Sequence, residues 1–174
     1  MDKLKKFYKN KFLLYGASIK GVGWYNSSKA KKRYKNLLRI IDTKNKSKFS
    51  LLDVGCGYGE LLNYCNFKKL RSYQGIDLVD EMINYAIIKH KDNNKIKFNV
   101  RNLFHEKKKY DYVICNGIFT LKSSLTNQDM FNYVKKCINH FYKISRKGFA
   151  FNVMSEKVDF KSKDLFYIKN DKLV

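Results

Sequence analysis

The chain has 174 residues, 44% of them apolar and 30% charged, which suffices for one domain (1–174) with its own hydrophobic core. No apolar run of 18 residues occurs, and MDKLKKFYKNKF at the N-terminus lacks the apolar segment of a signal peptide. We therefore expect no membrane partner and a cytoplasmic location. The four cysteines lack the CxxC or Cys/His spacing of a zinc site, so no metal is expected.

The formal net charge of +22 has two explanations. Lysine and arginine neutralise phosphates, which indicates a nucleic-acid partner. The alternative is compositional drift, because Lys outnumbers Arg by 32 to 5 and the chain has 17 Asn and no Pro. Proteins that read bases favour the arginine fork, so we prefer drift. The charge still favours anionic substrates through long-range steering.

The chain divides into a basic N-terminal segment and an alternating region. Residues 1–27 are aromatic and basic and are broken into turns by glycines, whereas 28–41 have helical apolar spacing with Ser28 as N-cap. Thr126 and Asp129 form a variant capping box. We predict strands at 49–55, 72–77, 96–100, 110–116 and 148–155, and helices at 58–67, 78–91 and 126–145. This alternation is typical of an α/β fold in which a mostly parallel sheet has helices on both faces.

Polar side chains stand at the ends of three predicted strands. Asp53 belongs to the first strand, Asp77 to the second and Asn116 to the fourth. In open parallel sheets, ligands bind outside the carboxyl ends of the strands. We therefore expect these three residues to gather at one edge of the sheet.

The stretch LLDVGCGYGE (51–60) places three glycines at alternate positions after the first strand. Glycines there allow a sharp turn and a close approach of the backbone to a ligand. The spacing differs from the GxGxxG dinucleotide fingerprint, and the GK[ST] of a phosphate-binding loop is missing. Asp53 adds a negative charge beside the turn. A cationic or zwitterionic nucleoside therefore fits better than a pyrophosphate.

Asp77 ends the second strand, where a carboxylate can accept hydrogen bonds from both hydroxyls of a ribose. The alternative is that Asp77 only caps the following helix. The glycine turn and the acid occur together at the spacing that nucleoside binding needs, which favours the ribose.

DVGCGYG followed by GIDLVDEMINYA resembles the class I S-adenosylmethionine (SAM)-dependent methyltransferases over residues 48–155. The segments YGASIKGVGW, DYVICNGIF and GFAFNVMS resemble a subgroup of small bacterial methyltransferases. The resemblance implies a Rossmann-like sheet of about five strands in the order 3-2-1-4-5. It also implies SAM as cofactor, S-adenosylhomocysteine (SAH) as product, and residues 1–47 as a cap with the first helix.

The resemblance also implies roles for individual residues. The turn would lie beside the methionine part of SAM, Asp77 would hold the ribose, and the third strand would lead to the adenine edge. Many members carry Asp where this chain has Asn102, although an amide can both accept and donate there. The implied cofactor contacts in the turn are Asp53, Gly55, Cys56 and Gly57. The implied ribose contact is Asp77, and the implied adenine contacts are Leu78, Asn102 and Leu103. The implied contacts near the sulfonium and the acceptor are Asn116 and Gly117.

Two residues of the N-terminal segment are further candidates. Arg33 lies on the polar side of the predicted helix 28–41, where its fork could bind the SAM carboxylate or face solvent. Trp24 is the single tryptophan and is flanked by glycines that could act as hinges. It is expected either to close over the pocket or to pack in the core.

Methyl transfer from SAM needs alignment more than acid–base chemistry, and no residue is nominated as a general base, so the catalytic residues stay unassigned. The chain lacks [DNS]PP[YFW] after the fourth strand and a Pro-Cys pair, which disfavours methylation of nucleic-acid bases. We expect a small-molecule acceptor. The alternatives are a methyltransferase acting on RNA or another nucleic acid and a SAM- or SAH-binding module without turnover.

Residues 156–174 form a short tail. Methyltransferases of this class usually add two strands after the fifth, and this tail is too short for a helix and both strands, so the C-terminal strand pair is expected to be reduced or missing. Segment 165–170 could form one short strand. An open edge at the fifth strand is a pairing hazard, and we expect the tail or a second copy, as in a homodimer, to cover it.

Overall fold

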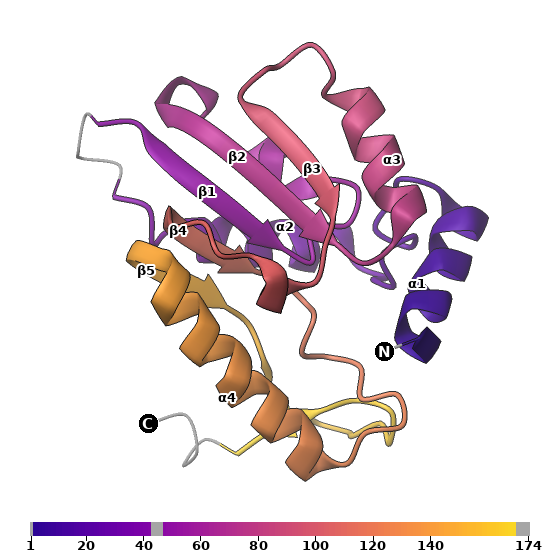
Figure 1. The fold of residues 1–174 in the computed structure, drawn as a ribbon. Coiled ribbons are helices and arrows are strands. Elements are labelled where there is room, and N and C mark those ends of the chain that lie inside the picture. The colour runs from indigo at the N-terminus through magenta and orange to yellow at the C-terminus, as the bar shows by residue number, and fades with distance from the viewer. Residues whose placement is uncertain (1, 43–46, 170–174) are drawn as a thin grey trace.

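The computed structural model describes residues 2–42 and 47–169 and contains one sheet of five parallel strands (Figure 1). Their order, β3-β2-β1-β4-β5, confirms the predicted Rossmann-like topology 3-2-1-4-5. The strands are β1 (Phe49–Val54), β2 (Leu70–Asp77), β3 (Ile96–Val100), β4 (Tyr110–Cys115) and β5 (Ser145–Phe151).

Helices cover both faces of the sheet, and β1 and β4 are therefore buried along their whole length. On one face, α2 (Ser27–Leu38) and α3 (Asp80–Lys89) pack with the alternate residues Leu51 and Tyr73 of the central strands. On the other, α4 (Asn127–Ile144) packs on Leu52 and Val113. In Figure 1, α4 lies in front of the sheet and α2 behind it.

The ends of the helices follow from local hydrogen bonds. The Asn26 side chain, and not Ser28 as predicted, caps α2 by accepting a hydrogen bond from the Lys29 N–H. The structure confirms the capping box of α4, in which the Thr126 hydroxyl accepts from the Asp129 N–H and the Asp129 carboxylate accepts from the Thr126 N–H. Each cap satisfies donors that the first turn leaves without a helical partner.

The N-terminal segment contains a helix that the sequence interpretation missed. Residues predicted as turns form α1 (Asp2–Tyr15), whose Tyr8 and Phe12 lie at the i, i+4 spacing of one helical face. Phe12 is buried against Tyr58, Val79 and Met82. This packing holds α1 against α3, although lysines dominate the rest of the helix.

The predicted helix at 58–67 is wrong. The glycine turn leads instead into η1 (Glu60–Tyr64), a 3₁₀ helix of five residues, and then into η2 (Phe67–Lys69). Gly59, the N-cap of η1, has a left-handed φ of 83° and provides no side-chain cap, and Cys65 returns to extended backbone. An α-helix therefore does not begin at this turn.

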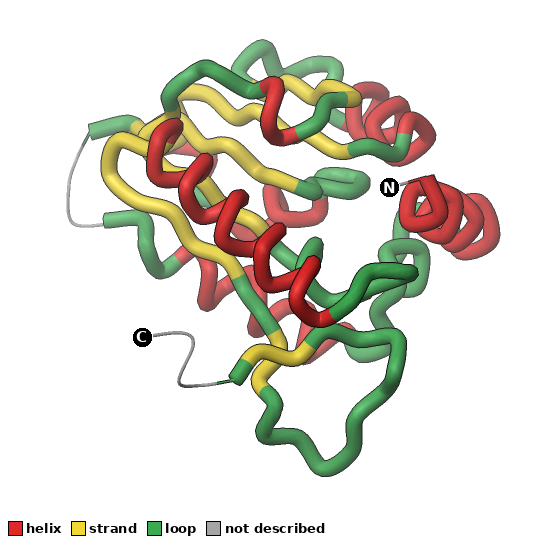
Figure 2. The backbone as a smooth tube through the Cα atoms, turned by 60° about the horizontal axis from the view of Figure 1, so that its bottom comes forward, coloured by secondary structure: helices red, strands yellow, loops and turns green. Residues whose placement is uncertain are grey.

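The C-terminal strand pair is reduced, as predicted, because β6 (Met154–Ser155) and β7 (Tyr167–Ile168) pair only with each other in the described residues. Figure 2 shows this small sheet apart from the five-stranded sheet. The described part of the tail therefore does not pair with the edge of β5. Coverage of this edge by the tail or by a second copy stays a prediction, and light scattering can test for the second copy.

Candidate active site

The glycine turn after β1 has a backbone that side chains rarely adopt. Gly55, Gly57 and Gly59 have φ angles of 71°, 54° and 83°. The N–H groups of Gly55 and Cys56 donate to the Ile76 carbonyl at 2.9 and 3.1 Å, which fastens the turn to β2. The Cys56 side chain packs in the core, and burial raises the pKa of its thiol. The side chain of Cys56 is therefore not available to a ligand.

Asp77 connects the turn to the end of β2. One carboxylate oxygen accepts from the Gly57 N–H at 2.9 Å, and the other accepts from the N–H groups of Leu78 and Val79 at 2.7 and 3.0 Å. Burial raises the pKa of Asp77, and these three bonds oppose the rise. The oxygen that accepts only from the Gly57 N–H keeps a second lone pair, so the helix-start role does not exclude the ribose role.

Asp53 lies deeper than the other predicted contacts. Its side chain is 2% exposed and accepts a hydrogen bond from the Tyr73 hydroxyl at 2.7 Å. Burial raises the pKa of Asp53 to about 7, and the charge of Asp77 adds to this effect. Burial thus disfavours the ionised form of this carboxyl, and a nearby cation would favour it.

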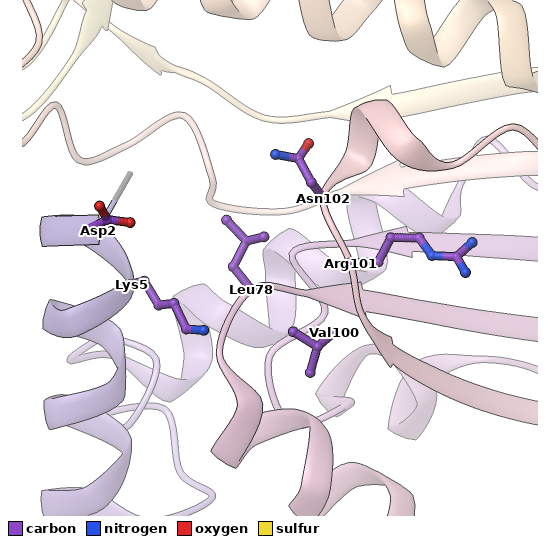
Figure 3. A pocket seen from close by; sticks show the side chains of 6 residues that line it. All are labelled: Asp2, Lys5, Leu78, Val100, Arg101 and Asn102. Atoms are coloured by element: carbon purple, nitrogen blue, oxygen red, sulfur yellow. The ribbon is translucent and has the colours of Figure 1, made fainter.

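A pocket of about 220 Å³ lies between α1 and the carboxyl ends of β2 and β3 (Figure 3). The predicted adenine residues Leu78 and Asn102 line it together with Asp2, Lys5, Val100 and Arg101. The Asn102 side chain also accepts from the Phe104 N–H at 3.0 Å and caps η3 (Leu103–His105). Leu103 packs in the core, so its side chain does not reach this pocket.

The second group of predicted residues meets at the end of β4. Gly117 has a left-handed φ of 87°, and a Cβ at this position would lie 3.1 Å from Trp24 Cζ2. The Arg33 guanidinium carbon lies 5.1 Å from the centre of the Trp24 ring system. Trp24 also packs against Tyr34, with ring centroids 5.6 Å apart. The structure thus joins the two N-terminal candidates to the β4 end of the site.

Asn152 is a candidate site residue that the sequence interpretation missed. Its side-chain oxygen accepts from the Gly117 N–H at 2.8 Å, and its amide nitrogen donates to the Asn116 side-chain oxygen at 2.7 Å. The rule that selected Asp53, Asp77 and Asn116, a polar residue at a strand end, also applies to Asn152. It was overlooked because the predicted strand ran to 155, whereas β5 ends at Phe151.

The structure also tests fit to SAM. A Cβ on Gly55 would overlap Ile118 Cγ2, and one on Gly57 would lie 3.2 Å from Val22, so the glycines keep a close-fitting cradle. The side-chain nitrogen of Asn116 is buried without a hydrogen-bond partner. Polar groups for a zwitterionic nucleoside are therefore present along the edge. The described residues contain no His/Cys/Asp/Glu cluster suited to a metal.

A parallel 3-2-1-4-5 sheet, a glycine turn after β1 and a carboxylate at the end of β2 together define a class I SAM-dependent methyltransferase. The family model described as "Methyltransferase domain" matches residues 25–147, and the chain belongs to this family. The protein is therefore a SAM-dependent methyltransferase, with SAM as its cofactor. None of the described helices is long and apolar enough to span a membrane.

Individual proteins are similar to this chain at low identity. "Putative methyltransferase Rv1506c" of Mycobacterium tuberculosis is 27% identical over 133 residues, which cover 75% of this chain and 78% of the relative. The SAH complex of magnesium protoporphyrin IX methyltransferase from Synechocystis PCC 6803 has a TM-score of 0.70 at 16% identity, covering 99% of this chain and 84% of that one. The SAH complex of the N-methyltransferase NodS from Bradyrhizobium japonicum has a TM-score of 0.63 at 14% identity, covering 84% and 71%. The structural likenesses bear on the fold alone.

Proposed function

We propose that this methyltransferase transfers the methyl group of SAM to a small-molecule acceptor by in-line displacement. The observation that carries the proposal is the packing of Trp24 on Gly117. It brings the N-terminal segment over the end of β4, where the resemblance puts the acceptor. Such a cover suits an enclosed small acceptor and is an obstacle to a nucleic-acid strand.

The distribution of charge also supports a small acceptor over RNA. The pocket beside Leu78 is lined by two cations, Lys5 and Arg101, together with Asp2. The Arg101 guanidinium is paired with Glu106 at 2.8 Å. A second cation-lined groove, of about 820 Å³, includes Arg146 and Lys147. These residues begin β5 at the amino end of the sheet, away from the glycine turn.

Catalysis on this proposal consists mainly of positioning. Bound SAM supplies an activated methyl group on its sulfonium. Asp77 would accept from the ribose hydroxyls, Leu78 and Asn102 would hold the adenine, and Arg33 would bind the carboxylate of the amino-acid part. Alignment of an acceptor with the methyl group can lower the barrier by roughly 7–11 kcal/mol in favourable cases. We propose a cytoplasmic reaction, which fits the four free thiols of the described chain.

The test combines binding and turnover. Calorimetry with SAM and SAH measures cofactor affinity, and methyl-labelled SAM is then incubated with the protein and either a pooled small-molecule extract or total RNA. We expect transfer to the small-molecule pool. Transfer to RNA alone would favour an RNA methyltransferase, whereas SAH binding without any transfer would identify a binding module.

A further inference from the structure

The amide groups of Asn116 and Asn152 are oriented by a single backbone donor. The Gly117 N–H can only donate, so the side-chain atom of Asn152 that faces it at 2.8 Å must be the oxygen. The nitrogen of Asn152 must then face Asn116, and it donates to the Asn116 oxygen at 2.7 Å. In this arrangement, the side-chain nitrogen of Asn116 is the amide group of the pair that is left without a hydrogen-bond partner.

That nitrogen is a buried donor without an acceptor. The Asn116 side chain is 9% exposed, and its Nδ2 has no hydrogen-bond partner in the described structure. A buried amide N–H without an acceptor is costly. Asn116 directly follows β4, beside Gly117 with its Trp24 cover. A ligand bound there is favoured if it offers an oxygen with a free lone pair.

The groups around Asn116 favour one type of ligand oxygen as the acceptor of its N–H. None of the hydrogen bonds that the described residues make to Asn116, Gly117 or Asn152 comes from an ionisable side chain, so a hydroxyl acceptor would lack a neighbouring base. A protonated amine would point its own N–H groups at the Asn116 donor. A carboxylate offers lone pairs and is already ionised at neutral pH.

We propose that the methyl acceptor is a carboxylic acid whose carboxylate is held by the Asn116 N–H, with Asn152 as the positioning residue, and that the product is a methyl ester. This inference rests on the proposed function. One carboxylate oxygen forms a bond to the methyl carbon with its lone pair, and the S–CH₃ bond breaks with its electron pair going to sulfur. The negative acceptor and the positive sulfonium become a neutral ester and a neutral thioether, and no proton is released.

The test reads the chemical class of the product without knowing the acceptor. The full chain is incubated with methyl-tritiated SAM and a small-molecule extract, and the labelled products are treated with mild alkali. Methyl esters release volatile methanol under these conditions, whereas N-methyl, C-methyl and ether products keep the label. Most of the transferred label is expected as methanol. Alkali-stable label would overturn the carboxylate inference and leave the methyltransferase proposal standing, and SAH binding with no transfer would overturn both.

A variant tests the positioning role of Asn152. In Asn152→Asp, the new carboxylate can accept from Gly117 but cannot donate to Asn116, so Asn116 must turn its N–H toward residue 152. Alkali-labile transfer should fall about tenfold or more, the effect of one hydrogen bond to a charged group, through a higher KM for the acceptor. SAH affinity should stay within about twofold, far less than a tenfold change. Asn36→Asp, on the exposed side of α2, is the matched control.

Two results would overturn this assignment of the amide pair. An equal loss of SAH affinity in Asn152→Asp would indicate that the Asn116 N–H receives the carboxylate of the cofactor. Unchanged acceptor kinetics in a folded Asn152→Asp would show that the orientation of Asn116 does not matter to transfer. The alkali test on the unaltered protein stands whether or not the variant folds.

Discussion

The indole of Trp24 lies on Gly117, so close that a Cβ added to Gly117 would be 3.1 Å from Cζ2 of the indole. Arg33 lies on the same indole, with its guanidinium carbon 5.1 Å from the centre of the ring system. The two residues come from the N-terminal segment, and Gly117 comes from the end of β4. Any movement of the N-terminal segment therefore changes the surroundings of the end of β4.

Replacement of Arg33 by alanine should weaken SAM binding by about tenfold, because a guanidinium hydrogen bond to a carboxylate contributes roughly 1.5–3 kcal/mol. Trp24 is the single tryptophan, so its fluorescence reports binding at this position, with calorimetry as the second measurement. Arg39→Ala, at the exposed C-cap of α2, should bind SAM like the parent protein. If Arg33→Ala does so too, Arg33 is a surface residue that only packs on Trp24.

Gly55→Ala should destabilise the protein much more than Gly16→Ala. Both glycines have left-handed φ angles, 71° and 61°, so both variants carry the cost of that conformation, about 1–2 kcal/mol. Only the Cβ at 55 would overlap a neighbour, Ile118 Cγ2, whereas the Cβ at 16 meets nothing within 4 Å. Overpacking adds about 1–3 kcal/mol. Urea unfolding measures the difference, and equal losses would show that the turn has room for a side chain.

Asp77→Ala should weaken SAM binding by about 1.5–3 kcal/mol through loss of the ribose contact. It should also lower the free energy of unfolding, because the N–H groups of Gly57, Leu78 and Val79 lose their acceptor. Calorimetry at a temperature where the variant is folded separates the two effects. A stability loss with unchanged SAM affinity would leave Asp77 with the helix-start role alone.

Asp53 should make stability depend on pH. Burial raises its pKa from 3.8 to about 7, so between about pH 4 and pH 7 the folded protein holds a proton that the unfolded chain releases. The free energy of unfolding should therefore fall as the pH rises through this window, by on the order of 4 kcal/mol for about three pKa units. In Asp53→Asn this component should disappear, and the variant should gain on the parent above pH 7. Urea unfolding at several pH values tests this, and parallel curves for the two proteins would contradict it.

Much of the fold follows from patterns within short segments. The alternation of strand and helix signals along the chain predicts the parallel sheet, and the strand order agrees with the one that the family resemblance implies. The capping box of Thr126 and Asp129 depends on residues three positions apart and was also predicted correctly. The predicted helix after the turn failed because Gly59 adopts a left-handed φ, which the surrounding turn imposes and helical propensity does not reveal.

The sequence by itself determined the class of protein and its cofactor, because the glycine spacing and Asp77 lie within a single strand–turn–strand segment. The tertiary structure decided which residues meet at the end of β4. Trp24 reaches Gly117, and Asn152 reaches Asn116 from 36 residues away. Such contacts depend on how whole elements pack against one another. The orientation of the Asn116 and Asn152 amides also depends on the backbone N–H of Gly117. Every residue other than proline carries such an N–H, so the sequence does not reveal this role.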